Sequence, residues 1–102
     1  MSRIPQLLKL AESEPSDADV LYMLAQEHAK EGSHTEAITW YNRCLAVDQG
    51  YHYAYFHKAR SLESMGEKEK AKEALRAGLE RAKADGAAKA VNEITGYLAE
   101  LG

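Results

Sequence analysis

The organisation of this chain is set by two consecutive segments of equal length. Residues 18–51 read ADVLYMLAQEHAKEGSHTEAITWYNRCLAVDQGY, and residues 52–85 read HYAYFHKARSLESMGEKEKAKEALRAGLERAKAD. When the second segment is placed under the first, small and apolar residues coincide: Ala25 with Ala59, Gly32 with Gly66, Ala37 with Ala71, and Leu45 with Leu79. A fixed period of this size is typical of stacked supersecondary units.

Each segment has the pattern of a helix, a tight turn and a second helix. Apolar residues recur at threes and fours, as on one face of an α-helix, and predict helices over 18–31, 35–48, 52–65 and 68–84. Gly32 and Gly66 stand where the first helix of each segment must stop, because glycine adopts the left-handed conformation of a helix end at little cost. Asp17 and Asp19 lie at the first helix start, where carboxylates are favourable.

The residues outside the two segments predict two further amphipathic helices, over 4–13 and 87–101. One helix pair cannot bury its apolar face alone, so neighbouring pairs must stack. We therefore predict an all-α solenoid of antiparallel helix hairpins with about six helices. We expect one domain over 1–102, with an N-terminal helix at 3–14, repeats at 18–51 and 52–85, and a capping helix at 87–101.

Composition favours a helical domain without special chemistry. The chain has 102 residues, 45% of them hydrophobic, and a net charge of −3, which does not suit a nucleic-acid partner. Cys44 is the only cysteine, so no intramolecular disulfide can form. We find no apolar stretch typical of a signal or a membrane span. We expect a cytoplasmic protein with neither a nucleic-acid nor a membrane partner.

The residues of the two segments resemble the tetratricopeptide repeat. Its pattern of large, small and aromatic places is matched in the first segment by Leu21, Leu24, Ala25, His28, Ala37 and Tyr41, and in the second by Tyr55, Ala59, Leu62, Ala71, Leu75 and Gly78. Three positions depart from it: Lys58 replaces a leucine, and Gln49 and Lys83 replace prolines. The resemblance implies a right-handed solenoid, and we expect the stem of Lys58 to lie on the core while its ammonium reaches water.

In this family the first helix of each pair lines a concave groove that holds a peptide. The resemblance therefore implies a groove lined by Tyr22, Gln26, Lys30, Tyr53, Phe56, His57 and Arg60. Family members that grip a C-terminal carboxylate use lysine and asparagine at places that carry Tyr22, Gln26 and His57 here. We therefore expect a protein or peptide partner, but not a carboxylate clamp.

Aromatic residues gather at the start of the second segment. Tyr51, Tyr53, Tyr55 and Phe56 fall within six residues, and a helix cannot bury all of them on one side. Tyr55 is best explained as core, whereas Tyr53 and Phe56 lie on another face. Aromatic side chains are enriched at binding hot spots, but packing against neighbouring helices explains these two rings equally well.

The sequence offers no constellation for catalysis or metal binding. The four histidines are not spaced as metal ligands, and we expect His34, His52 and His57 at the surface and His28 in a packed slot. Cys44 aligns with Gly78 and is interpreted as a small packing residue. We expect no enzyme activity and no cofactor.

Two functions remain open at this point. The first is a scaffold or adaptor that binds a protein segment in the groove. The alternative is a self-associating homodimer that uses Trp40 or the terminal helices. We favour intramolecular packing for Trp40, and expect a monomer or a weak homodimer.

Overall fold

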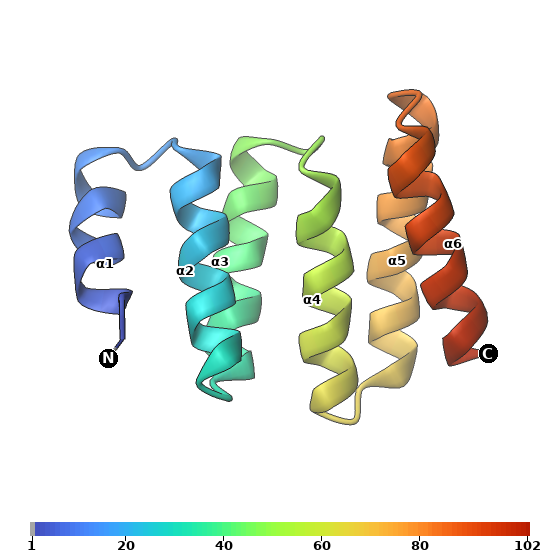
Figure 1. Cartoon of the computed structure of the whole chain (residues 1–102), viewed down its shortest axis with the longest axis horizontal. Coiled ribbons are helices and arrows are strands. Elements are labelled where there is room, and N and C mark those ends of the chain that lie inside the picture. Colours follow the sequence, from blue (N-terminus) through green and yellow to red (C-terminus); the bar gives the residue numbers. More distant parts are fainter. Residues whose placement is uncertain (1) are drawn as a thin grey trace.

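The computed structural model describes residues 2–102, which form six α-helices and no strand (Figure 1). The helices are α1 Ile4–Ser13, α2 Ala18–Lys30, α3 His34–Val47, α4 His52–Ser64, α5 Lys68–Ala84 and α6 Ala88–Leu101. The predicted helices are all present, each ending within one residue of its expected bounds. The fold class predicted from the sequence, an all-α helical solenoid, is confirmed.

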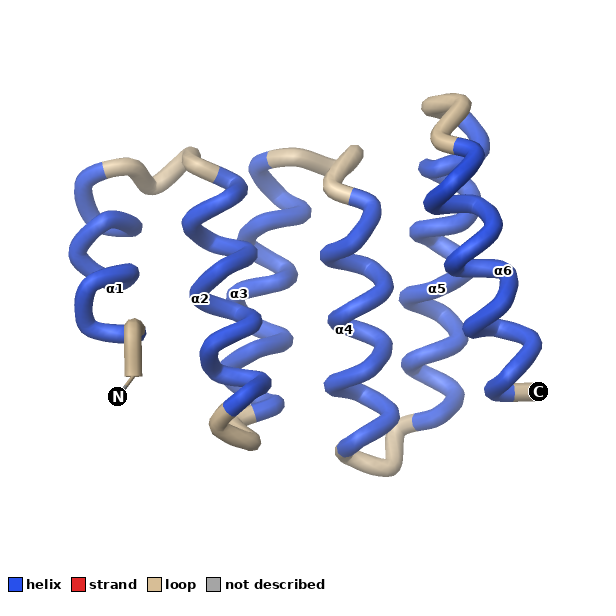
Figure 2. The backbone as a smooth tube through the Cα atoms, in the orientation of Figure 1, coloured by secondary structure: helices blue, strands red, loops and turns tan. Residues whose placement is uncertain are grey.

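The helices form two layers. In Figure 1, α2 lies in front of α3 and α6 lies in front of α5, while α4 contacts both α2 and α6. We call the face made by α2, α4 and α6 the A face, and the opposite face, made by α3 and α5, the B face. Successive helices are joined by the short connections drawn in Figure 2. The A face therefore carries the first helix of each pair, as expected for a groove.

The turn glycines end their helices by the same hydrogen bonds. Gly32 and Gly66 both have a φ of 79°, a left-handed conformation that costs a residue with a Cβ atom more than it costs glycine. Just beyond them, the Ser33 amide donates to the His28 carbonyl and the Glu67 amide donates to the Leu62 carbonyl, both at 2.9 Å. This arrangement satisfies carbonyls at the helix end, and it turns the chain back into the second helix of the pair.

The start of α2 is fixed by Asp17. Its Oδ1 atom accepts hydrogen bonds from the amides of Asp19 at 3.1 Å and Val20 at 3.3 Å. These amides have no partner within the helix, so the carboxylate satisfies groups that would otherwise depend on water. The sequence-based prediction of a cap at this position is confirmed for Asp17.

The core depends on small residues where the helices of a pair meet. Ala25, Ala37, Ala59 and Ala71 are fully buried, with 0% of their surface exposed. Gly78 of α5 is under the tightest constraint, because a Cβ atom added there would lie 2.6 Å from Cβ of Tyr55 on α4. Close approach of α4 and α5 therefore requires the absence of a side chain at this position.

Candidate peptide-binding groove

A hollow opens between α2 and α4 on the A face. Its volume is about 490 Å³. It is lined by Arg3, Met23, Gln26, Glu27, Ala29, Lys30, His34, Tyr41, His57, Arg60, Ser61 and Ser64. We call it the α2–α4 hollow. Residues from both repeats line it, so it exists only because the two pairs stack.

A second, smaller hollow lies between α4 and α6. Its volume is about 270 Å³, and Phe56, Arg60, Glu63, Tyr97 and Glu100 line it. We call it the α4–α6 hollow. Arg60 lines both hollows, so the two adjoin along α4 and together form one interrupted groove.

Five of the seven residues expected in the groove line these hollows. Gln26, Lys30, His57 and Arg60 meet in the α2–α4 hollow, and Phe56 lies with Arg60 in the α4–α6 hollow. They come together because residues three or four apart share one helix face. The remaining two, Tyr22 and Tyr53, line neither hollow.

The ring of Tyr22 packs against other aromatic rings. Its centroid lies 4.8 Å from that of Tyr51 and 5.9 Å from that of His57, distances at which aromatic pairs attract. Burial raises the pKa of the Tyr22 hydroxyl to about 12. Tyr22 therefore supports the wall behind His57.

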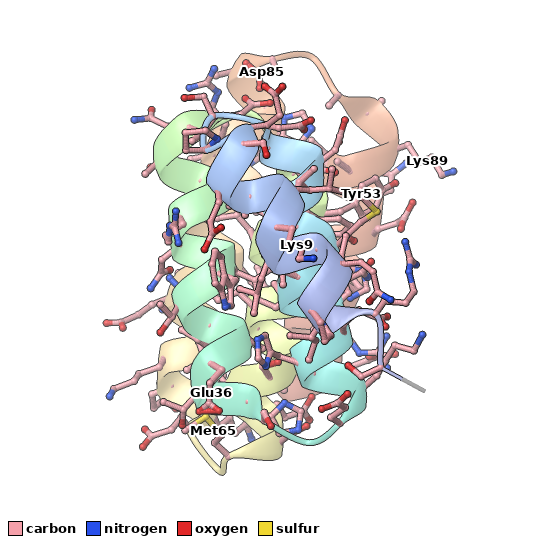
Figure 3. The ribbon with its side chains drawn as sticks, turned by 90° about the vertical axis from the view of Figure 1, so that its left-hand side faces the viewer. Lys9, Glu36, Tyr53, Met65, Asp85 and Lys89 are labelled. Carbon is pink, nitrogen blue, oxygen red and sulfur yellow. The ribbon has the colours of Figure 1, made fainter. Side chains whose placement is uncertain are left out.

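Tyr53 bridges the A-face helices at their edge. Its side chain is 36% exposed, and its hydroxyl donates to Glu93 of α6 at 3.0 Å. That hydrogen bond is the main cause that raises the pKa of the Tyr53 hydroxyl. Figure 3 labels this residue beside Lys89 on the same side of the molecule. Part of Tyr53 is thus left to solvent.

The α2–α4 hollow carries an excess of positive charge. The hollow is lined by three cationic side chains, Arg3, Lys30 and Arg60, and by one carboxylate, that of Glu27. The Lys30 ammonium lies 3.2 Å from Glu27 Oε2, yet the Lys30 side chain is 75% exposed. This hydrogen bond holds the pKa of the Glu27 carboxyl below its ordinary value. The hollow can therefore attract a further anion.

His57 contributes an uncharged side chain to the α2–α4 hollow. Burial, followed by repulsion from the neighbouring Arg60 guanidinium, lowers the pKa of its imidazole below 6.5. The ring is therefore uncharged at neutral pH and contributes hydrogen bonding and contact area. The positive charge of the hollow comes from the arginines and the lysine.

The sequence reasoning missed several groove residues. Arg3 precedes α1 and lies far from the repeats in sequence, so no repeat period could place it. Glu63 could have been found, because it continues the stripe of Phe56 and Arg60 at the next helical step. Glu100 stands at the end of the terminal helix, where no second copy of the repeat guides the alignment.

The expectation of three surface histidines is wrong. His34, His52 and His57 are all half-buried. His34 Nδ1 lies 3.1 Å from Ser61 Oγ, and His52 Nε2 lies 2.8 Å from Asp85 Oδ2. These contacts join residues that do not share a helix, and a spacing argument along one helix cannot detect them.

Other residues singled out in the sequence have packing roles. The Trp40 ring packs against the core, and the Arg43 guanidinium carbon lies 4.4 Å from its centroid. Cys44 is fully buried, and burial raises the pKa of its thiol to about 12. Neither arrangement exposes a reactive group.

Lys58 lies outside the groove. It lines a hollow of about 550 Å³ on the B face, beside Ile38 and Leu62. Burial lowers the pKa of its ammonium, and no ion pair among residues 2–102 includes it. Lys58, one of the three positions that depart from the repeat pattern, is thus a partly desolvated cation.

Residues 2–102 contain neither a cluster of metal ligands nor a helix suited to a membrane. No group of three or more histidine, cysteine or acidic residues there is arranged to hold a metal ion. Within the same residues, no helix has the length and apolar character needed to cross a membrane.

Comparison with known proteins agrees with the two-repeat pattern. The family model for the tetratricopeptide repeat matches residues 18–51 and 52–85 in succession. A curated relative, the Protein SGT1 homolog of Oryza sativa subsp. japonica, is 34% identical over 74 residues. That match covers 72% of this chain and 20% of the relative. The chain therefore spans about a fifth of the length of that relative.

Three solved structures share the fold. A tetratricopeptide repeat domain protein from Salinibacter ruber is 25% identical, with a TM-score of 0.79, over 85% of this chain and 88% of that one. The TPR2B domain of yeast Sti1, solved in a complex with pHsp70, is 23% identical with a TM-score of 0.88, covering 96% and 78%. PcrH, solved with the chaperone binding region of PopD, is 18% identical with a TM-score of 0.86, covering 93% and 72%.

The family matches account for two thirds of the chain, and the observed helix pairs and turn glycines follow the same period. The chain therefore belongs to the tetratricopeptide-repeat family.

Proposed function

We propose that this chain is a protein-interaction module that binds a peptide or protein segment along the A face. One observation carries the proposal: Gln26 and Lys30 of α2 meet His57 and Arg60 of α4 around a single hollow of about 490 Å³. Ligand sites in proteins are concave and combine apolar walls with a few convergent polar groups. This hollow combines the apolar residues Met23 and Ala29 with charged and amide side chains.

The structural relatives support the same class of function. Two of them were solved with a protein partner, pHsp70 in one case and a region of PopD in the other. Proteins of this family are typically interaction modules without catalytic activity. We extend that role to this chain, with Phe56 and Tyr53 as contacts at the α6 side and Tyr22 as support for His57.

The class of partner and the compartment belong to the same proposal. We infer a protein partner and no nucleic acid, since the net charge is −3 and only three of the 13 lysine and arginine residues line the α2–α4 hollow. Cys44 is a free, buried thiol, which suits a reducing compartment. We therefore assign the function to the cytoplasm.

Affinity capture from an extract of the native cell, read by quantitative mass spectrometry, tests the proposal. Wild type is compared with Arg60→Ala and with Arg76→Ala, which removes the same charge from an exposed position of α5 on the B face. We expect at least one protein to be captured by wild type and Arg76→Ala and lost from Arg60→Ala. An identical set of proteins on all three baits contradicts binding at the A face.

Self-association is the second candidate. Helix α1 exposes 39% of Leu8 and 47% of Leu10, and exposed apolar side chains are found at protein interfaces. Trp40 supports it less, because its ring already packs against the core. Sedimentation velocity over a concentration series, with Leu10→Glu as the variant, separates the two. A monomer at all concentrations rejects the dimer.

A further inference from the structure

The two hollows of the A face carry opposite charge. Arg3, Lys30 and Arg60 outnumber Glu27 in the α2–α4 hollow. In the α4–α6 hollow the balance is reversed, because Glu63 and Glu100 outnumber Arg60. The groove is thus positive at one end and negative at the other.

The positive charges remain available to a ligand. Arg60 takes part in no ion pair among residues 2–102. The Arg3 guanidinium lies 4.0 Å from the sulfur of Met23 and forms no ion pair among the same residues, although its charge contributes to lowering the pKa of the Glu27 carboxyl. Lys30 has a carboxylate neighbour but remains three-quarters exposed. A carboxylate on a partner would therefore meet at least two guanidinium groups without displacing an internal ion pair.

One of the two negative charges, that of Glu63, is held in place by a hydrogen bond. The Tyr97 hydroxyl donates to Glu63 Oε1 at 2.6 Å, which positions this carboxylate. The Tyr97 ring lies 5.0 Å from that of Phe56, so the acidic hollow has an aromatic wall. Such a wall suits the aliphatic stem of a lysine or arginine, which lies on apolar surface while its charged end reaches a carboxylate.

We propose that the A face selects a peptide segment with two blocks of opposite charge, its acidic block in the α2–α4 hollow and its basic block in the α4–α6 hollow. This rests on the proposed function, since it names the ligand class of the same groove. Charges of like sign placed opposite each other across an interface are costly. A wholly acidic segment would meet Glu63 and Glu100, and a wholly basic one would meet Arg3, Lys30 and Arg60.

The test begins with a random-peptide display library selected on the immobilised full chain, with Arg60→Ala as the counter-selection bait. Enriched peptides are expected to carry a cluster of Asp or Glu and a separate cluster of Lys or Arg. One such peptide and a wholly acidic analogue, both with blocked termini, are then synthesised and titrated by fluorescence anisotropy.

The variant Glu100→Lys makes the α4–α6 hollow positive. Its matched control is Glu80→Lys, which makes the same change in net charge at an exposed position of α5. We expect Glu100→Lys to weaken the two-block peptide about tenfold and to tighten the acidic analogue, since one exposed attraction becomes a repulsion. Glu80→Lys is expected to change neither dissociation constant by more than about twofold, because its charge is distant and screened. Circular dichroism of both variants checks that the fold is kept.

The outcomes separate this inference from the proposed function. Enriched peptides without two charge blocks, or equal effects of Glu100→Lys and Glu80→Lys, overturn the two-block inference while Arg60-dependent binding still stands. If wild type enriches no peptide over the Arg60→Ala bait, both the inference and the proposed function are overturned. Two-block peptides with opposite responses to Glu100→Lys support both.

Discussion

Gly78→Ala is the sharpest test of how closely the second helix pair is packed. An added Cβ atom at this position would lie 2.6 Å from Tyr55 Cβ and 2.8 Å from Tyr55 Cγ. The closer atom, Cβ, is bonded directly to the backbone of α4, so a change of rotamer cannot move it aside. The substitution must therefore push α4 and α5 apart.

Two opposing effects set the size of the change. Overpacking a core costs about 1–3 kcal/mol, and contacts this short with near-backbone atoms place the cost near the upper limit. Alanine in a helix interior is favoured over glycine by about 1 kcal/mol. The net loss is therefore about 2 kcal/mol, which corresponds to a decrease in Tm of about 8 °C for a domain of this size.

Gly96→Ala in α6 is the matched control. Gly96 is exposed, and its added Cβ atom would have no neighbour within 4 Å. Only the helix preference acts there, so stability should rise by about 1 kcal/mol. Urea unfolding followed by far-UV circular dichroism measures both changes. If Gly78→Ala is as stabilising as Gly96→Ala, the close contact between α4 and α5 is refuted.

Three further predictions concern single side chains. Asp17→Ala should lower the free energy of unfolding by about 1 kcal/mol, because the amides of Asp19 and Val20 lose their cap; an unchanged urea midpoint would contradict this role. Lys58→Leu should raise the free energy of unfolding by about 1 kcal/mol, because the substitution replaces a partly desolvated ammonium with apolar surface. A less stable variant in the same assay would show that the ammonium has a favourable partner. The pKa of His57 is lowered in the folded state, so the imidazole binds a proton more readily in the unfolded chain. The free energy of unfolding therefore decreases as pH falls below about 6.5. Urea unfolding at several pH values should show a smaller decrease for His57→Gln, and an unchanged pH dependence would remove His57 as a cause.

The fold could be predicted from the sequence because its signals are local and repeated. The apolar period gave the helices, and Gly32 and Gly66 gave the turns, since each signal needs only residues of one segment. That positions 44 and 78 hold small residues also followed from the alignment. The requirement for glycine at Gly78 did not, because it depends on how closely Tyr55 of another helix approaches.

The sequence could place a residue in the candidate groove only where its position on one face of a helix was sufficient. Gln26, Lys30, His57 and Arg60 share faces of α2 and α4, and the hollow brings them together. Tyr22 lies on the same face in sequence, but Tyr51 from the connection before α4 packs on its ring. Periodicity does not describe such connections, and contacts made by them were therefore missed.

The partly buried histidines have the same explanation. His34 contacts Ser61 on another helix, and His52 contacts Asp85, which directly follows α5. Sequence spacing within one helix shows which residues share a face. It does not show which residue of the next helix will be opposite, because that depends on the angle and register of packing.

Mapping the bound peptide by NMR tests the central claim most directly. The amide resonances of the full chain would be assigned and followed while a display-selected peptide is added. Binding along the A face predicts that the largest shifts fall on α2 and α4, around Gln26, His57 and Arg60, and extend to Glu100 of α6. Largest shifts on α3 and α5 would contradict the claim, because they would place the peptide on the B face.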